Sequence, residues 1–420
     1  MPLPASATNT SSPNPTTPPA RRRRLILALG LAVLLVVAAA ALLFRFRTRP
    51  DPDLIWRQAQ NELHAEQIDR AEADLKRITQ LRSPTILDWF LRAQVAMARA
   101  RTDEALADLA KIWDHPQHGA QARLMAGQLE LRRHRLRPAE EAFLGALALD
   151  PKLVQARREL IYIYGVQLRR QPLHEQFRAL SELMPLTFDN VFHWCLTRNT
   201  LWEPQELSEM MTRFLQADPD DRWSRLSLAE SLRSLGRRGD AEKQLESLPA
   251  SDPDARAIRV RLALDRGDDQ AAESLLSEGP RDHPELARLR GRLAMARGDG
   301  AAALRHFRLA LAAEPDNRDT VFGLSGALSL LGDQTEAAKY RALARDHDLL
   351  GSLMQKASTP THRNDPALFR QLGAACEAIH RLPEARSWYN LLITQDPLDK
   401  EAQQALFRVK TAIAAEKAKK

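Results

Sequence analysis

The sequence predicts an all-α solenoid of about ten stacked helix-turn-helix repeats. Prolines recur at a constant interval, since Pro151, Pro185, Pro219 and Pro253 are each 34 residues apart. A period of this length is typical of stacked two-helix repeats. Beyond Asp51, apolar residues follow the 3.6-residue period of helices and no run alternates as a strand would. These observations favour a protein that binds other molecules over one that transforms them.

The charge distribution argues against a nucleic-acid-binding protein. The 420-residue chain has a net charge of +7, which alone would suit binding to phosphates. Of its 61 lysines and arginines, seven lie in residues 1–50, where there is no aspartate or glutamate, which leaves 54 basic against 54 acidic side chains in 51–420. The repeat region is therefore neutral and predicts no nucleic-acid partner.

The N-terminal residues predict a tail followed by a membrane span. Residues 1–20 hold six prolines, seven serines or threonines and no charge, so we expect them to be disordered. Residues 21–49 form an arginine-flanked segment in which residues 25–44 have no polar side chain. Twenty such residues span about 30 Å as a helix, the thickness of a bilayer core. A cleaved signal peptide, ending near the alanines at 38–41, is the alternative.

The arginines around this segment indicate its orientation. Four precede the span and three follow it. The positive-inside rule therefore favours a single-pass protein with a cytoplasmic N-terminus. The repeat array would then lie outside the cytoplasm, in a periplasmic or extracellular position.

Small residues and phenylalanines recur inside the units. The spacing of Ala139, Phe143, Ala146 and Pro151 is repeated 164 residues later. The repeated set is Ala303, Phe307, Ala310 and Pro315. Glycines accompany both sets, with Gly127 and Gly291 inside helices and Gly298 and Gly332 at turns, where glycine accepts positive φ. This pattern resembles the tetratricopeptide repeat family over most of residues 52–397.

The resemblance implies a right-handed superhelix in which the first helix of each pair lines a concave groove. The domain organisation follows from it. We expect a repeat array at 52–349, a linker or insertion at 350–364, and a final repeat with a C-terminal capping helix at 365–416. Units 152–185 and 186–219 are the least regular and are identified mainly by their prolines. Asp220, Asp254 and Asp316 suit the N-caps of the helices that follow.

Motifs for catalysis are missing from the sequence. There is no nucleophile elbow, phosphate loop, zinc-protease motif or dinucleotide fingerprint. We therefore expect no enzymatic activity, no cofactor, no metal and no small-molecule substrate. Cys195 and Cys376 lie 181 residues apart in apolar patterns and are expected to be buried free thiols. Asp346, His347 and Asp348 are expected at a solvated helix end.

The inward positions that the resemblance implies give the candidate ligand contacts. Aromatic and arginine side chains at these positions are favoured, because these residue types dominate binding hot spots. The candidates are Trp56, Phe90, Arg158, Tyr162, Phe192, Trp223, Arg261, Arg288 and Arg292. Each aromatic could instead pack between repeats, and each arginine could simply be solvated.

The sequence thus predicts a membrane-anchored scaffold that holds a protein or peptide in its groove and assists complex assembly at the membrane. The bilayer would be a partner through residues 25–44. Two alternatives stay open: a secreted binding protein after signal cleavage, and a non-catalytic regulatory subunit of an envelope enzyme or secretion system. Catalysis in 350–364 or 152–219 is a further alternative, motivated only by the irregularity of those segments.

Overall fold

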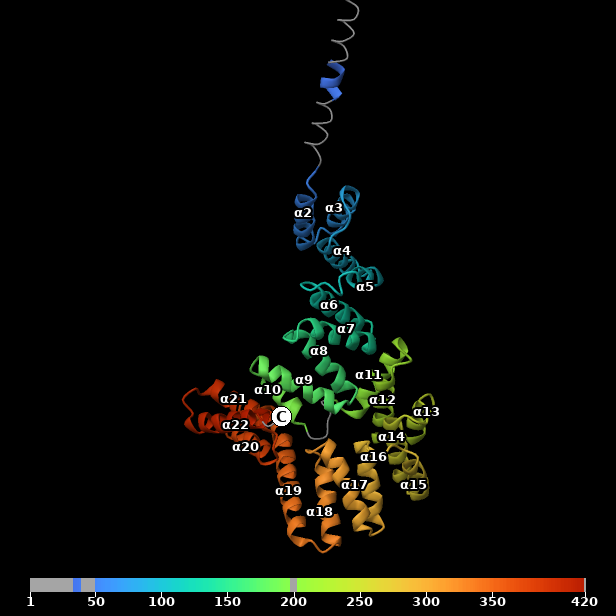
Figure 1. Cartoon of the computed structure of the whole chain (residues 1–420), viewed down its shortest axis with the longest axis vertical. Coiled ribbons are helices and arrows are strands. Elements are labelled where there is room, and N and C mark those ends of the chain that lie inside the picture. The colour runs from blue at the N-terminus through green and yellow to red at the C-terminus, as the bar shows by residue number, and fades with distance from the viewer. Residues whose placement is uncertain (1–32, 39–49, 197–201, 419–420) are drawn as a thin grey trace, which may run out of the picture. The chain divides into compact units, whose positions relative to one another are not determined.

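The described part of the chain is helical throughout. The computed structural model describes residues 33–38, 50–196 and 202–418, and every regular element in these ranges is a helix (Figure 1). The chain divides into two compact units, residues 1–99 and 100–420. The expected all-α repeat architecture is confirmed for the described residues.

The first unit contains three long helices. They are α2 (Pro52–His64), α3 (Ile68–Leu81) and α4 (Ile86–Ala98). Buried apolar side chains such as Ala59, Leu75 and Ile78 pack these helices together. The start of α4 is set by a capping box, in which Thr85 and Asp88 satisfy each other's backbone N–H groups.

The second unit continues the two-helix plan. Its helices are α5 (Thr102–Ala110), α6 (Gly119–Arg132), α7 (Leu136–Leu149), α8 (Val154–Val166), α9 (Arg170–Leu183), α10 (Phe188–Cys195), α11 (Pro204–Ala217), α12 (Arg222–Ser234), α13 (Arg238–Glu246), α14 (Pro253–Asp265), α15 (Asp269–Ser277), α16 (Pro284–Ala296), α17 (Gly300–Ala313), α18 (Arg318–Leu330), α19 (Gln334–Ala357), η1 (Pro360–His362), α20 (Pro366–Ala378), α21 (Leu382–Gln395) and α22 (Lys400–Ala418). Most consecutive helices pack as pairs, for example α6 with α7 and α16 with α17.

The glycines inside the first helices make room for aromatic rings of the second helices. A Cβ on Gly127 would lie 2.5 Å from the ring of Phe143, and one on Gly291 would lie 2.7 Å from that of Phe307. Both rings are buried, at 0% and 1% exposure. The recurring glycine and phenylalanine are therefore one packing device, in which the ring occupies the space of the missing side chain.

Turns and caps follow the sequence with small shifts. Gly298 and Gly332 have positive φ, +74° and +82°, as expected at the turns between paired helices. The expected N-caps were displaced by one or two residues. The observed caps are Asp221, Asp252 and Asn317, not Asp220, Asp254 and Asp316. At α14 the reason is local: proline favours the first helical position, so Pro253 starts the helix and the preceding aspartate caps it.

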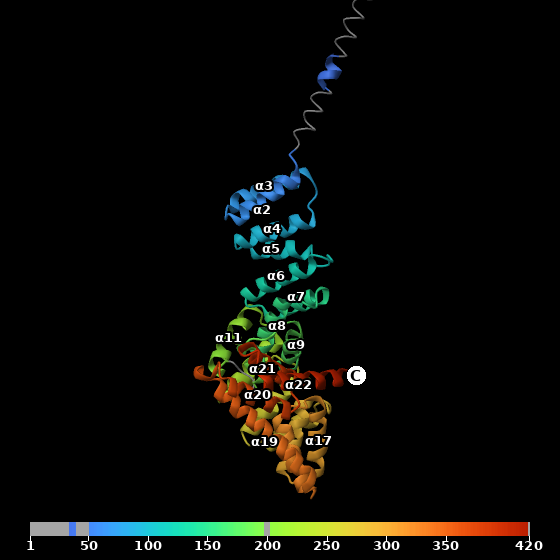
Figure 2. The same cartoon turned by 90° about the vertical axis from the view of Figure 1, so that its left-hand side faces the viewer.

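Helix α10 interrupts the pairing and allows the array to return on itself. It packs against α21 and α19 (Figure 1), and α21 also packs against α9 (Figure 2). On the other side, α8 joins α12, where Ser227 Oγ donates to the Val166 carbonyl at 2.7 Å. Helices α8 to α21 therefore close into a ring. The irregular units 152–185 and 186–219 are the place where this closure occurs.

The closure is apolar in its middle. The only two cysteines of the chain meet there, with Cys195 Sγ 3.9 Å from Cys376 Sγ and both side chains buried. Trp388 Nε1 donates to Cys195 Sγ at 3.2 Å. The ring of Phe188 stacks on that of Phe369, with centroids 5.6 Å apart. Buried thiols were expected, whereas their proximity was not.

A buried ion pair borders this apolar contact. Arg381 is 4% exposed and donates through Nη2 to Asp316 Oδ2 at 2.6 Å, and Arg170 Nη2 donates to the same oxygen at 3.2 Å. Burial alone would raise the pKa of Asp316, but the guanidinium groups of Arg381 and Arg170 outweigh it and hold that pKa well below its usual range. The carboxylate is therefore charged and joins α9 to the C-terminal repeat.

The segment 350–364, where a linker or insertion was expected, begins as the end of a long helix. Residues 350–357 are the last part of α19, which has 24 residues, and η1 follows at Pro360–His362. The expectation of a solvated helix end at 346–348 was wrong for His347, which is 3% exposed. Because α19 continues past this point, His347 lies within the helix and faces the ring.

The predicted tail at 1–20 lies outside the described residues, and so does most of the predicted span at 25–44. The described piece, residues 33–38, is helical, and Val33 to Val37 are 57–69% exposed. Among the described residues, no helix combines the length and apolar character needed to cross a bilayer.

Candidate ligand-binding cavity

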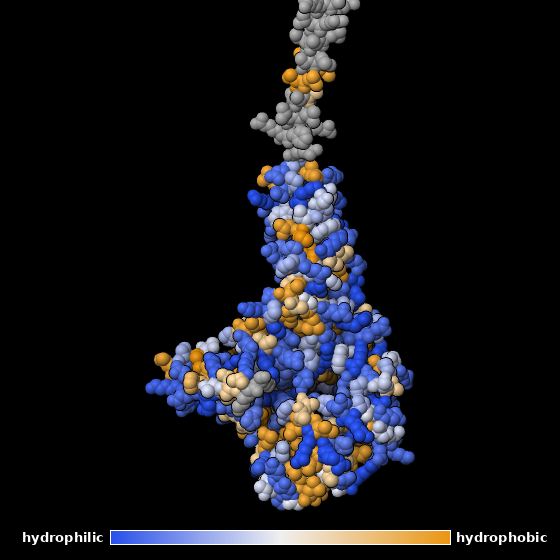
Figure 3. All heavy atoms as spheres, viewed as in Figure 1, coloured by the Kyte–Doolittle hydropathy of each residue, from blue (hydrophilic) through white to orange (hydrophobic). Residues whose placement is uncertain are grey.

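A polar cavity of about 880 Å³ lies inside the ring. Helices α12, α14, α16 and α18 supply most of its wall, with contributions from α19 and from the chain before α11. Six arginines line it: Arg170, Arg233, Arg261, Arg288, Arg292 and Arg318. The carboxylates of Glu230, Asp265, Asp316, Asp319 and Asp348 line it too. Figure 3 shows the mainly hydrophilic surface that surrounds the hollow.

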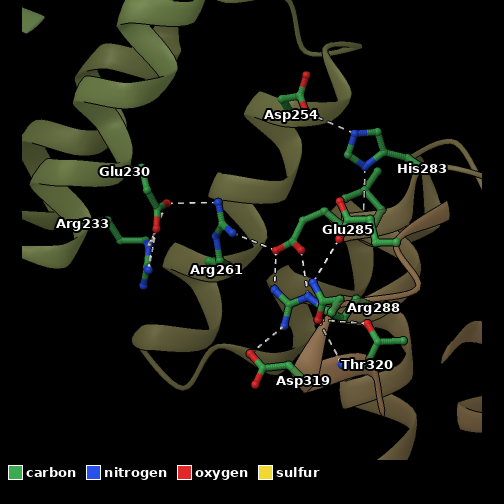
Figure 4. Close-up of polar contacts among 12 residues, drawn as sticks. Glu230, Arg233, Asp254, Arg261, His283, Glu285, Arg288, Asp319 and Thr320 are labelled. Atoms are coloured by element: carbon green, nitrogen blue, oxygen red, sulfur yellow. Dashed lines mark hydrogen bonds and ion pairs between the residues drawn. The ribbon is translucent and has the colours of Figure 1, made fainter. Parts of the chain in front are cut away.

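These charges form an alternating row, which we call the charge ladder. It consists of Asp265, Arg233, Glu230, Arg261, Glu285, Arg288 and Asp319. Figure 4 shows the part from Arg233 to Asp319. Arg261 is its centre, because its two Nη atoms reach Glu230 of α12 at 3.0 Å and Glu285 of α16 at 2.8 Å. Arg288 Nη2 then lies 2.6 Å from Glu285. The ladder thus connects the first helices of four consecutive repeats.

Burial makes these charges strongly interdependent. Desolvation would lower the pKa of Arg288, but the Glu285 carboxylate outweighs it and raises that pKa. Desolvation would likewise raise the pKa of Glu285, while Arg261 and Arg288 hold it below its usual range. The Glu285 carboxylate and the Arg288 guanidinium are therefore both ionised near neutral pH. The charged groups of the ladder pair with one another, and these ion pairs hold neighbouring repeats at a fixed spacing.

Arg292 lies on the same wall but outside this pairing. Its side chain is exposed, and it makes no ion pair with any residue in the part of the chain that the structure describes. Position explains this. Glu230, Arg261, Arg292 and Gly326 are each the ninth residue of their helices, α12, α14, α16 and α18. At this position the helix before Arg261 carries Glu230, a carboxylate. The helix before Arg292 carries Arg261, and the helix after it carries Gly326.

Three of the nine sequence-predicted residues meet at the cavity. They are Arg261, Arg288 and Arg292, which come from two consecutive first helices. Arg158 is exposed elsewhere on α8, and its Nη2 lies 3.7 Å from Met184 Sδ. Whether any of these side chains contacts a ligand stays a prediction.

The predicted aromatics of the second unit pack between helices. The rings of Tyr162 and Trp202 meet edge to face at 6.3 Å, and burial raises the pKa of the Tyr162 hydroxyl. Phe192 stacks on Phe188 at 5.7 Å. The Trp223 ring lies under two guanidinium groups, those of Arg169 at 4.5 Å and Arg222 at 4.2 Å. None of these three predicted rings is among the cavity-lining residues.

The remaining two predicted aromatics belong to the first unit. Trp56 is half-buried on α2 and its Nε1 donates to the Leu87 carbonyl at 3.4 Å. Phe90 is half-buried on α4. Their role in binding also stays a prediction.

Sequence reasoning missed the acidic half of the cavity. Glu230 and Glu285 each precede an arginine by three residues, in Glu230–Arg233 and Glu285–Arg288. This spacing places both charges on one helix face and could have been recognised in the sequence. It would have identified Arg233 and Arg288 as paired, whereas the partners of Arg261 lie on neighbouring helices and need the tertiary structure.

A metal site is not evident in the described ranges. No group of three or more His, Cys, Asp or Glu side chains there is placed to hold an ion. The imidazole rings of His115 and His118 stack at 5.1 Å.

Comparisons with known proteins support the repeat fold. The family profile of the tetratricopeptide repeat matches residues 288–348, which cover most of α16, α17, α18 and part of α19. No curated protein matches the chain. The described residues thus form an all-α helical repeat fold that resembles tetratricopeptide repeat proteins, and the family match is confined to residues 288–348.

Solved structures with a similar arrangement include three kinds of protein. A tetratricopeptide repeat protein from Parabacteroides merdae has 15% identity and a TM-score of 0.31, over 58% of this chain and 98% of its own. The APC/C hetero-tetramer Cut9–Hcn1 has 13% identity and a TM-score of 0.36, over 88% and 92%. The human IFIT1 dimer with m7Gppp-AAAA has 14% identity and a TM-score of 0.32, over 89% and 83%. Scores this low equate no residue of this chain with a residue of theirs.

Proposed function

We propose that this protein is a membrane-anchored, non-catalytic scaffold that binds a segment of a partner protein in the cavity of its ring and assists complex assembly at the membrane. The observation that carries the proposal is the cavity of about 880 Å³ lined by four consecutive first helices. Its size lies within the range of ligand sites, about 300–1,000 Å³. Its wall is stiffened by the charge ladder, so a ligand would meet a preorganised surface.

A photo-cross-linking experiment tests the binding site. A benzophenone amino acid replaces Ser234, which is exposed and lines the cavity. The matched control carries it at Lys243, which is exposed on the adjacent helix α13 and does not line the cavity. We expect a discrete protein adduct from position 234 in intact cells and not from position 243. Equal adducts from both positions, or none, would contradict the proposal.

The membrane anchor is the second part of the proposal. It is supported by residues 25–44, which have no polar side chain, and by the arginines on both sides. The full-length protein should remain in the membrane pellet after alkaline carbonate extraction and keep its own N-terminus. A soluble protein that begins near residue 42 would instead support signal cleavage. A phosphatase reporter fused after Lys420 should be active, because the array is proposed to lie outside the cytoplasm.

A further inference from the structure

A second, more apolar cavity adjoins the first on the same wall. It has a volume of about 470 Å³ and shares Arg288, Arg292 and Asp319 with the polar cavity. We call it the α16–α18 groove. Its remaining lining residues are Met295, Phe307, Phe322, Gly323 and Gly326. Figure 3 shows hydrophobic residues gathered over α18, beside the hydrophilic surface of the ring.

Two glycines create this groove. A Cβ on Gly323 would lie 2.4 Å from the Phe307 ring, so that ring occupies the space next to the α18 backbone. A Cβ on Gly326 would meet only the end of Met295, at 2.9 Å. Phe322 stands beside them with 53% of its surface exposed. The exposed ring of Phe322 beside these two glycines can therefore contact an apolar side chain of a bound segment.

The same glycine leaves Arg292 without a carboxylate. Gly326 occupies the helix position that carries Glu230 in α12 and Arg261 in α14. The other five arginines of the polar cavity already have carboxylates, for example Arg233 with Asp265 at 2.7 Å and Arg318 with Asp348 at 2.9 Å. Arg292 is thus the arginine of this wall whose charge is available, and it stands where the two cavities join.

We propose that the α16–α18 groove selects the partner segment, by taking a large apolar side chain over Gly326 and pairing Arg292 with an adjacent aspartate or glutamate. This inference rests on the proposed function and names the chemistry of its ligand. Charge complementarity identifies the occupant, because every arginine of the charge ladder already pairs with a carboxylate, whereas Arg292 adds a positive charge that no carboxylate of the described residues pairs. A basic or purely apolar segment would leave that charge unpaired at the edge of the contact.

Peptide selection tests the proposal. A phage-displayed library of random heptapeptides is selected against the full-length protein in detergent micelles. Parallel selections use Arg292→Glu, Gly326→Leu and, as control, Arg308→Glu. Arg308 is exposed on α17 and lines neither cavity. Gly326→Leu keeps Arg292 and fills the groove, because Met295 can move aside.

The wild-type protein and Arg308→Glu should enrich peptides with an apolar residue beside an acidic one. Arg292→Glu should enrich a basic residue in place of the acidic one, and should bind the wild-type peptides at least about tenfold more weakly. Gly326→Leu should lose the preference for a large apolar residue. Identical motifs from the wild type and Arg292→Glu would overturn this inference and leave peptide binding intact. No enriched peptide from the wild type would overturn the proposed function as well.

Discussion

Replacing Asp316 with asparagine should loosen the closure of the ring. The Asp316 carboxylate accepts from Arg381 at 2.6 Å and 3.1 Å and from Arg170 at 3.2 Å. Arg381 is 4% exposed and so has little access to water. Asparagine keeps the size of the side chain and removes its charge, so Arg381 would stay buried without this partner.

The size of the effect follows from the geometry. Leaving one member of a buried ion pair without its partner costs about 3–5 kcal/mol. The Asp316 side chain is 26% exposed, and Glu384 also raises the pKa of Arg381 and remains beside it, so the loss should be smaller. We expect the opening of the closure to become easier by about 2 kcal/mol, which is about 30-fold in the opening equilibrium.

The two cysteines report this opening directly. Cys195 and Cys376 are the only thiols of the chain and both are 0% exposed. A thiol reagent can reach them only when α10 and α20 separate, so its rate under native conditions follows the population of the open ring. The Asp316→Asn variant should therefore be labelled about 30-fold faster than the wild type.

A matched variant separates closure from general destabilisation. Asp252 also pairs with a guanidinium, since it accepts from Arg222 at 2.5 Å and 2.8 Å, but it lies at the start of α14, outside the closure. Asp252→Asn should leave the labelling rate within about twofold of the wild type, because sites without shared partners act independently. Adding Arg381→Met to Asp316→Asn should recover part of the loss. Wild-type labelling of Asp316→Asn, or equal acceleration by Asp252→Asn, would refute the reasoning.

Two further predictions concern glycines and a buried histidine. Gly332 has φ +82° and open space around it, so Gly332→Ala should destabilise by about 1–2 kcal/mol through backbone strain alone. Gly351 lies inside α19 with equally open space, so Gly351→Ala should instead stabilise the protein by up to about 1 kcal/mol. If the two variants shifted the thermal midpoint in the same direction, this pair of predictions would be contradicted. Burial lowers the pKa of His347 to about 4. The unfolded chain, with a histidine pKa near 6.5, then binds the proton first, so stability should fall as the pH drops from about 6.5 to about 4. His347→Gln should flatten this dependence in urea unfolding at pH 7 and pH 5, and an unchanged dependence would exclude His347 as its source.

Local packing within each repeat could be predicted from the sequence. The Ala, Phe, Ala spacing around Phe143 and Phe307 indicated repeated helices with small residues inside them, and the structure places Gly127 and Gly291 under those rings. Gly298 and Gly332 were expected at positive φ because they recur at the turns of the repeats, where glycine accepts that conformation. These features involve residues close in sequence, and their periodic recurrence makes them visible.

The candidate site was only partly predictable. Arg261, Arg288 and Arg292 were identified by residue type and implied position, but so were Phe192 and Trp223, which pack between helices. Residue type does not say which arginine is paired. That depends on whether the neighbouring helix carries Glu230 or Gly326 at the facing position.

The sequence by itself determined the repeat, its helical class and the neutrality of the array, because each repeat contacts mainly its neighbours and a fixed period encodes those contacts. Only the tertiary structure decided that the array closes, since Cys195 meets Cys376 from 181 residues away and Asp316 meets both Arg170 and Arg381. Small rotations per repeat add up over many units, and their sum cannot be read from any single unit. That sum creates the cavity, and Gly326 on the neighbouring helix leaves Arg292 unpaired on its wall.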